Sequence, residues 1–233
     1  MSLRAKVSAI AFTAATCMLL APSAMASTHG PVQVTGKQLT SALLPASDFV
    51  AGYKTIFAGN SGGSLEHGTT HHIPSMNCFV FWASIGADKG YGETAFAEEM
   101  NGFKSGPVSV AEIFSQAVYQ FPSARAAASI YGQISAKYRS CRTASMPDPK
   151  GGLIIEQVHS QSTQRIGGHR ALLLVEYLTD TKLHGSPLVT DALWTLDGTN
   201  VYLVSSQLLN VRSPRPTLSS LTLKLIARVS ALR

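Results

Sequence analysis

A serine inside a glycine-rich segment is the first residue that could do chemistry. Residues 59–63 read GNSGG and match the G-x-S-x-G pattern found around nucleophilic serines. Such a serine needs a histidine base and an acid that orients the histidine. Past the N-terminal leader, His29 and Asp48 are the only histidine and acidic residue that precede Ser61. The segment between the leader and Ser61 is too short to form a protease barrel. The residues after Ser61 read GGSLEHG and predict no helix, so we expect an exposed loop at 59–74 without a catalytic serine.

The same predicted loop contains His67, His71 and His72 in the sequence HGTTHH, with Glu66 beside them. Imidazole and carboxylate groups are common ligands of transition metals. Adjacent histidines on an exposed loop rarely suit one tetrahedral ion, so we predict no metal site and no cofactor. A secreted hydrolase that uses Ser61, or a metal held by this loop, stays as the alternative hypothesis.

Polar residues also lie on two neighbouring predicted strands, joined by a turn at Gly167–Gly168. If these strands pair around that turn, His159 and Glu176 approach each other on one face of a sheet. Gln157 and Gln161 flank His159 at strand spacing and are expected to share its face. These polar residues form either a solvent-facing surface or a ligand-binding face.

The elements that would position these residues centre on a strand at 110–121 and a helix at 123–140. Pro122 ends the strand because proline has no N–H for the ladder, and Ser123 is placed to cap the helix. One face of this helix is apolar at steps of three and four residues: Ala127, Ile130, Tyr131, Ile134 and Tyr138. A second amphipathic helix is predicted at 217–232, with Thr217 as its cap.

Four strands are predicted after the long helix, at 153–163, 169–179, 188–196 and 201–209, with a hairpin at Asp197–Gly198. Segments 49–58 and 93–100 are further strand candidates, and the latter is expected to pair with 110–121. Short helices are expected at 37–44 and 78–85, and residues 143–152 are expected to form a loop. Tight turns between successive strands indicate an antiparallel sheet. We therefore predict a single α+β domain with a twisted antiparallel sheet of about five to six strands packed against helices.

The N-terminus predicts export. Residues 1–26 combine a basic start, an apolar stretch and a small-x-small site at Ala24–Ala26, which is the pattern of a signal peptide. The apolar run of roughly 14 residues is shorter than the about 20 that span a bilayer, so no membrane segment is expected after cleavage. Cys17 lacks a preceding lipobox leucine, so lipid anchoring is not expected. Residues 27–35 are interpreted as a flexible lead and 36–233 as the domain.

The charge of the exported chain is mildly basic, since removal of Arg4 and Lys6 lowers the net charge of +6 by two. No run of lysine and arginine marks a nucleic-acid arm, so no nucleic-acid partner is expected. Cys78 and Cys141 then remain, and two cysteines in an exported protein most simply pair, although two buried free thiols are the alternative. A disulfide bond would close a loop of about 64 residues, and the chain-entropy model predicts that it would stabilise the folded state by roughly 4 kcal/mol.

Several segments together resemble a known family. LLPASDF, SGGSLE, GETAFAE, AVYQFPSARAAA and KYRSC are similar to the PknH-like extracellular sensor domains of actinobacteria, over most of residues 36–209. The resemblance implies a two-layer α+β domain with a cleft, outside the cell, that binds an unidentified ligand. It transfers no catalytic residue. Kinase members have two disulfides, whereas Cys78 and Cys141 supply one here.

We therefore predict a secreted, non-enzymatic ligand-binding domain of the cell envelope or exterior. Its ligand would be an unidentified small molecule or cell-wall component. A structural envelope protein is a further reading. The residues expected at the cleft are those that lie on predicted strands and could reach one face: Tyr119, His159, Glu176 and Trp194.

Overall fold

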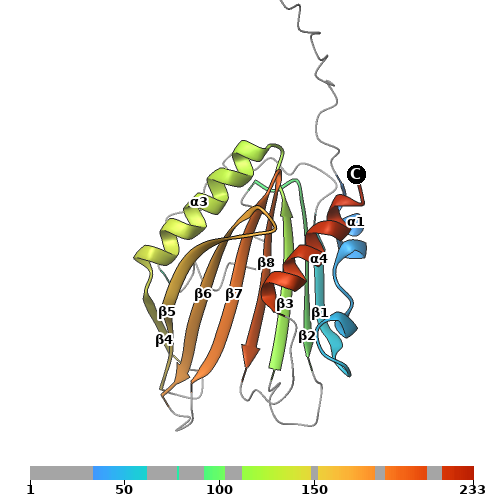
Figure 1. Cartoon of the computed structure of the whole chain (residues 1–233). Coiled ribbons are helices and arrows are strands. Elements are labelled where there is room, and N and C mark those ends of the chain that lie inside the picture. The colour runs from blue at the N-terminus through green and yellow to red at the C-terminus, as the bar shows by residue number, and fades with distance from the viewer. Residues whose placement is uncertain are drawn as a thin grey trace, which may run out of the picture. The chain divides into compact units, whose positions relative to one another are not determined.

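An eight-stranded antiparallel sheet forms the centre of the protein (Figure 1). The computed structural model describes residues 34–61, 78, 92–102, 112–147, 152–181, 187–208 and 217–233, all within the compact unit Pro31–Arg233. The strand order across the sheet is β1-β2-β3-β8-β7-β6-β5-β4. The strands are β1 (Lys54–Ser61), β2 (Ala95–Gly102), β3 (Glu112–Gln120), β4 (Thr143–Pro147), β5 (Leu153–Ile166), β6 (His169–Asp180), β7 (Leu188–Asp197) and β8 (Asn200–Leu208).

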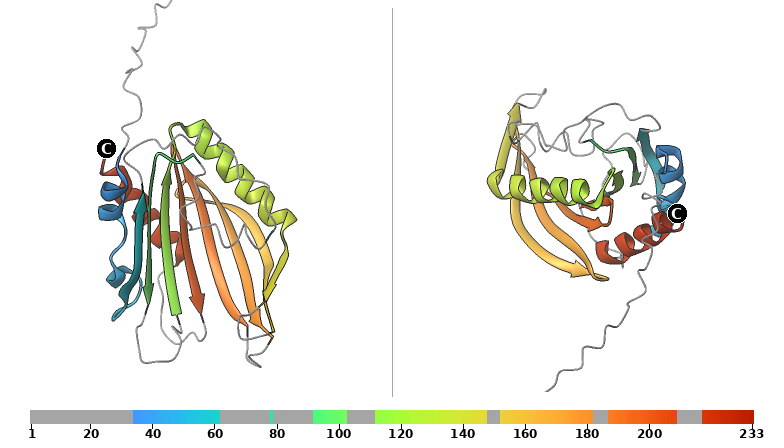
Figure 2. Two further views of the ribbon diagram at one scale, coloured as in Figure 1. Left: turned by 180° about the vertical axis from the view of Figure 1, so that it is seen from behind. Right: turned by 90° about the horizontal axis from the view of Figure 1, so that it is seen from above.

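Helices cover both faces of this sheet. Helix α3 packs on one face, which we call the α3 face, whereas α1 and α4 pack on the opposite face (Figure 2). The helices are α1 (Gly36–Ala42), the 3-10 turn η1 (Ala46–Asp48), α3 (Ala124–Ser140) and α4 (Leu218–Ser230). The α+β class, the antiparallel pairing and the packing of helices against the sheet are confirmed. No helix in the described part of the chain is long and apolar enough to cross a membrane.

The expected strand count of five to six was too low. Residues 143–147 were expected in a loop, yet they form β4 and pair with Leu153–Gln157 of β5. At the other edge β1 continues through Gly59 to Ser61, which pairs with Phe96, so the serine motif begins in a strand. Both misplaced segments lie at sheet edges, where one neighbouring strand supplies all the pairing and local composition is a weak guide.

The hairpins follow the turn residues of the sequence. Gly167 and Gly168 have φ of 52° and 88°, the left-handed values that a two-residue type I′ turn requires at both positions. Ile166 and His169 therefore face each other directly across the β5–β6 turn. In the β7–β8 hairpin Asp197 faces Asn200, and Gly198 at the turn has φ of 55°.

Helix α3 forms where its sequence predicts it. The Ser123 hydroxyl accepts a hydrogen bond from the Ala126 N–H, which caps the first turn. The five residues of the predicted apolar face are all buried against the α3 face. The helix ends at Cys141, whose N–H donates to the Lys137 carbonyl. Helix α4 is likewise capped by Thr217, whose hydroxyl accepts from the Ser220 N–H.

A disulfide between Cys78 and Cys141 fixes the end of α3. The Cα atoms are 5.2 Å apart, and both residues contact the core under α3. The predicted pairing is confirmed. The signal peptide, the histidine loop and the rest of the predicted 78–85 helix lie outside the described residues.

Two buried glutamines of β3 hold the N-terminal segment on the opposite face. The Gln116 side chain accepts from the Leu44 N–H at 2.8 Å and donates to the Leu44 carbonyl at 2.7 Å. The Gln120 side chain accepts from the Val34 N–H at 3.0 Å. Val34 is buried and Thr35 caps α1, so the described chain is already ordered at the end of the predicted lead.

Candidate functional site

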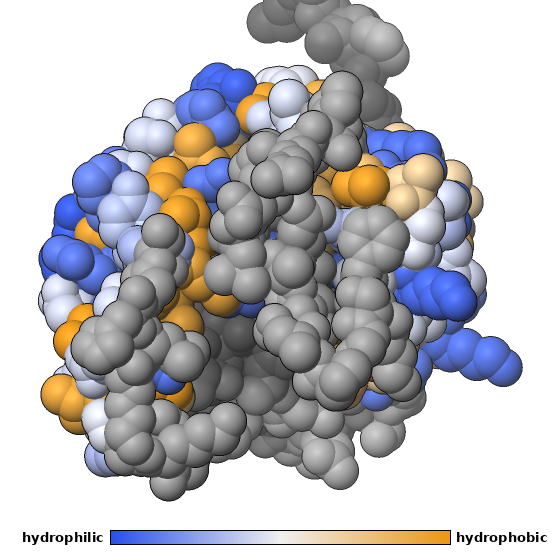
Figure 3. Space-filling view, turned by 90° about the horizontal axis from the view of Figure 1, so that it is seen from below, coloured by the Kyte–Doolittle hydropathy of each residue, from blue (hydrophilic) through white to orange (hydrophobic). Residues whose placement is uncertain are grey.

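A polar pocket lies on the α3 face, beside the C-terminal part of α3. It has a volume of about 120 Å³. Four strands and α3 contribute its walls: Tyr138 from α3, Glu156 from β5, Glu176 from β6, Thr190, Ala192 and Trp194 from β7, and Leu203 and Ser205 from β8. Seen from below, a band of hydrophobic residues lies beside hydrophilic ones on the surface of the molecule (Figure 3).

The alternation of side chains along paired strands brings these residues together. Glu176 lies opposite Thr190, and Trp194 lies opposite Leu203. Because side chains two residues apart on a strand share a face, residues from β6, β7 and β8 form one continuous floor. Tyr138 reaches this floor from the last turns of α3, above the disulfide.

Glu176 is the most unusual residue of the pocket. It is 6% exposed, and its Oε1 atom has no hydrogen-bond partner among the described residues. Burial, followed by the charge of the nearby Glu156, raises the pKa of Glu176 from 4.5 to about 8. Burial also raises the pKa of Glu156, to about 7. Both carboxyls therefore exchange protons close to neutral pH, and each can donate or accept a hydrogen bond there.

Aromatic groups line the pocket beside the carboxyls. Burial, followed by the charges of Glu176 and Glu156, raises the pKa of Tyr138 well above its usual value, and the nearby indole of Trp194 opposes this. Trp194 is 1% exposed, and its ring stacks on Tyr119 with centroids 6.1 Å apart. The pocket is thus a small, largely desolvated chamber with two acidic groups and two aromatic walls.

The structure brings two of the four expected cleft residues to the pocket. Glu176 and Trp194 line it, and Tyr119 lies behind Trp194, buried between it and Phe96. His159 lies on the opposite face, exposed, with its ring stacked on Tyr177 at 4.7 Å.

The expected approach of His159 to Glu176 was therefore wrong. Counting back from the Gly167–Gly168 turn places His159 opposite Glu176, but β5 has a bulge between Val158 and Ser160. One extra residue in a strand moves every side chain beyond it to the other face. Val158 consequently faces Glu176, and His159 points away from it. The expected sharing of a face by His159 and its flanking glutamines fails for Gln161, whose side chain donates to the Ser135 carbonyl of α3.

Sequence reasoning missed Tyr138 and Glu156. Tyr138 was assigned to the apolar face of the helix, and its position over an acidic residue could be recognised only with the helix docked. Glu156 lies two residues before Val158 on the same strand, so it shares the face of Glu176 once the bulge is known. An acidic residue at an inward position of a strand is the one indication that the sequence offered.

The alternative chemical site, at the edge of the sheet, is distant from the described histidines. Ser61 ends β1, whereas His159 lies on β5, six strand spacings away in the sheet order, or about 29 Å along the sheet. His169 lies at the β5–β6 turn, where its Nδ1 is 3.3 Å from an oxygen of Asp197. His67, His71 and His72 lie outside the described residues. Within the described ranges no group of three histidine, cysteine or acidic side chains is placed to hold a metal.

The fold and pocket define an α+β domain in which helices pack on both faces of an antiparallel sheet and a small pocket lies on the α3 face. Among solved structures, the chain resembles the crystal structure of the extracellular domain of PknH from Mycobacterium tuberculosis. The TM-score is 0.57 at 13% identity, over 85% of this chain and 97% of that one. The chain therefore has the fold of the PknH extracellular domain, as the sequence resemblance predicted.

Sequence comparisons add no further relative. No family model matches the chain, and no curated protein matches it. The likeness is thus one of fold, to an extracellular domain. The Cys78–Cys141 disulfide is consistent with the same location outside the cytoplasm.

Proposed function

We propose that this protein is an exported, non-enzymatic ligand-binding domain that takes its ligand on the α3 face, at the Glu176–Trp194 pocket. One observation carries the proposal: Glu176 is buried with an oxygen that no described residue satisfies. A buried polar atom without a partner costs about 1–3 kcal/mol, which a hydrogen-bonding ligand group would recover. Residues 1–26 support export, and the likeness to an extracellular sensor domain supports a binding role.

The pocket suits one group of a larger ligand. Its volume of about 120 Å³ is smaller than the roughly 300–1,000 Å³ of sites that enclose a whole small molecule. Two carboxyls and the Trp194 ring favour a hydrogen-bond donor, above all an amino group. An ammonium beside Glu176 would lower the pKa of its carboxyl, so binding an amine near pH 7 would release a proton. The bulk of the ligand, a small molecule or a cell-wall fragment, would then lie along the α3 face.

The test uses purified mature protein and a panel of soluble cell-wall fragments, with free amino groups or N-acetylated, together with lipid vesicles. We expect fragments with free amino groups to raise the melting temperature. Titration calorimetry in two buffers of different ionisation enthalpy should show proton release. Glu176→Gln should weaken this binding, whereas Asp191→Asn, a carboxyl on β7 that faces away from the pocket, should not. Equal binding by wild type and Glu176→Gln, or no response to any fragment, would overturn the proposal.

The hydrolase hypothesis is tested with the same panel. Each fragment is incubated with the protein, and its products are separated by mass spectrometry. A ligand-binding domain returns every fragment intact. Cleavage that is lost in Ser61→Ala, or after treatment with a chelator, would replace the binding proposal with a secreted hydrolase.

A further inference from the structure

A second, larger cavity lies between α3 and the β5–β6 hairpin, separate from the Glu176–Trp194 pocket. It has a volume of about 480 Å³, within the range of sites that enclose a small molecule. Its walls come from α3 and from both strands of the hairpin: Tyr131, Gly132, Ser135, Arg139, Thr163, Gln164, Arg165, Arg170 and Ala171. None of these residues lines the first pocket. Both cavities are lined by α3, β5 and β6, but by different residues of each element.

Positive charge dominates this cavity. Three of its residues are arginines, and none is acidic. Neither of the ion pairs between described residues, His169–Asp197 and Lys224–Asp48, involves an arginine of the cavity. Grouped cations without nearby acids repel one another, and an anion between them would remove this repulsion.

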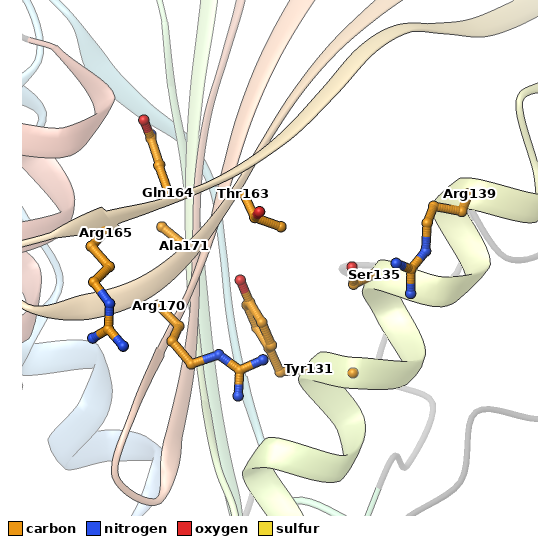
Figure 4. A pocket seen from close by; sticks show the side chains of 9 residues that line it. Tyr131, Ser135, Arg139, Thr163, Gln164, Arg165, Arg170 and Ala171 are labelled. Carbon is orange, nitrogen blue, oxygen red and sulfur yellow. The ribbon is translucent and has the colours of Figure 1, made fainter.

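The arginines are held in different ways. The Arg170 guanidinium lies over the Tyr131 ring, 5.6 Å from its centroid, and Arg165 donates to the Gly168 carbonyl at 2.9 Å. Arg139 projects from α3 two turns after Tyr131, about 12 Å further along the helix axis. Figure 4 shows Arg170 and Arg139 reaching into the same space from opposite ends, with Thr163 and Ser135 between them. The guanidinium groups at both ends and the hydroxyls between them can all donate hydrogen bonds to an anion.

Gly132 keeps one wall of the cavity bare. It lies inside α3, and a Cβ atom added there would meet nothing within 4 Å. A glycine inside a helix costs about 1 kcal/mol relative to alanine, and packing gives no reason for it at this position. The missing side chain leaves room between Tyr131 and Ser135, where the cavity opens.

From this arrangement we propose that the cavity binds a phosphate ester. A phosphate group has more acceptor oxygens than a carboxylate and up to two negative charges, so it can engage two arginine forks and a hydroxyl together. Arg139 and Arg170 hold the phosphate oxygens, Arg165 adds positive potential from the hairpin turn, and the remaining volume takes the group attached to phosphorus. A soluble phosphorylated compound and a lipid headgroup share this chemistry.

The experiment measures binding of inorganic pyrophosphate to the folded mature protein by calorimetry at low salt. We expect Arg139→Gln and Arg170→Gln each to weaken binding on the order of tenfold, as for loss of a charged hydrogen bond. Arg125→Gln, in the first turn of α3 and outside the cavity, makes the same charge change and should leave the affinity within twofold. Equal losses in all three variants would mean a diffuse charge effect and would overturn the proposal, as would no binding by wild type.

Gly132 gives a second test that leaves every charge in place. Gly132→Leu should fill the opening and weaken pyrophosphate binding, whereas Gly132→Ala should keep binding and raise the melting temperature. Unchanged affinity in a folded Gly132→Leu protein would refute this location.

Vesicles containing phosphatidic acid, compared with vesicles of phosphatidylcholine alone, then show whether the phosphate belongs to a lipid or to a soluble compound. Arg139-dependent vesicle binding indicates a lipid headgroup, and pyrophosphate binding alone indicates a soluble ester. Failure at this cavity leaves the Glu176 proposal untouched, because Glu176→Gln is measured with different ligands.

Discussion

Replacing Glu176 with glutamine should stabilise the protein at and above neutral pH and flatten the dependence of its stability on pH. The folded carboxyl has a pKa raised from 4.5 to about 8, so it holds its proton more tightly than the unfolded carboxyl does. Between these two values the unfolded chain loses the proton while the folded chain keeps it. The contribution of Glu176 to the free energy of unfolding is therefore highest below about pH 4.5, falls as the pH rises to about 8, and is level beyond that.

The magnitude follows from the two pKa values. For an isolated group, moving the pKa from 4.5 to about 8 lowers the free energy of unfolding by about 5 kcal/mol at high pH. Part of this effect is shared with Glu156, whose pKa is also raised and whose charge is one cause of the Glu176 value. We therefore expect wild type to lose about 3 kcal/mol between pH 5 and 8. Glutamine cannot ionise, so Glu176→Gln should be more stable than wild type by about 2 kcal/mol at pH 8 and nearly equal at pH 5.

The assay is urea denaturation at pH 5, 6, 7 and 8 at constant ionic strength, followed by tryptophan fluorescence with the disulfide intact. Glu99→Gln is the control, because Glu99 lies on β2 and faces away from the pocket. This variant should keep the wild-type slope. A wild-type protein that becomes more stable from pH 5 to 8, or a Glu176→Gln variant with the wild-type slope, would refute the assignment of a buried, neutral Glu176.

Two further predictions concern stability. Replacing Cys78 and Cys141 together with alanine should lower the free energy of unfolding by roughly 4 kcal/mol, because the bond closes a long loop, and added reductant should reproduce the loss in wild type only. A loss below about 1 kcal/mol would mean that packing alone holds the end of α3. Gln116→Leu should cost about 2–4 kcal/mol in urea denaturation, since the Leu44 N–H and carbonyl lose their buried partners. Gln157→Leu, at an exposed position of β5, should cost far less, and equal costs would contradict this account.

Much of the local structure could be predicted because its causes lie within a few residues. Pro122 and Ser123 determine where β3 ends and α3 begins, and the caps form as expected. Gly167–Gly168 supplies the backbone angles of its turn. The pairing of Cys78 with Cys141 followed from counting the thiols that remain after the predicted signal peptide.

The pocket could be predicted only in part. Glu176 and Trp194 were expected because each lies on a predicted strand and could reach one face of the sheet. Tyr119 also lies on a predicted strand, yet its ring stacks on Trp194 and is buried in the core. Such a difference depends on which neighbour covers a side chain, and a single strand does not contain that information.

The sequence alone predicted a signal peptide, and it determined the antiparallel α+β class, the span of α3 and the Cys78–Cys141 disulfide. Only the tertiary structure decided which side chains meet. Strand β8 pairs with both β3 and β7, so it joins the early and late halves of the chain. A one-residue bulge at Val158–Ser160 sends His159 to the opposite face. Turns and caps are set by short-range sterics and hydrogen bonds, whereas the face of a strand residue depends on the register accumulated over the whole hairpin, which one extra residue reverses.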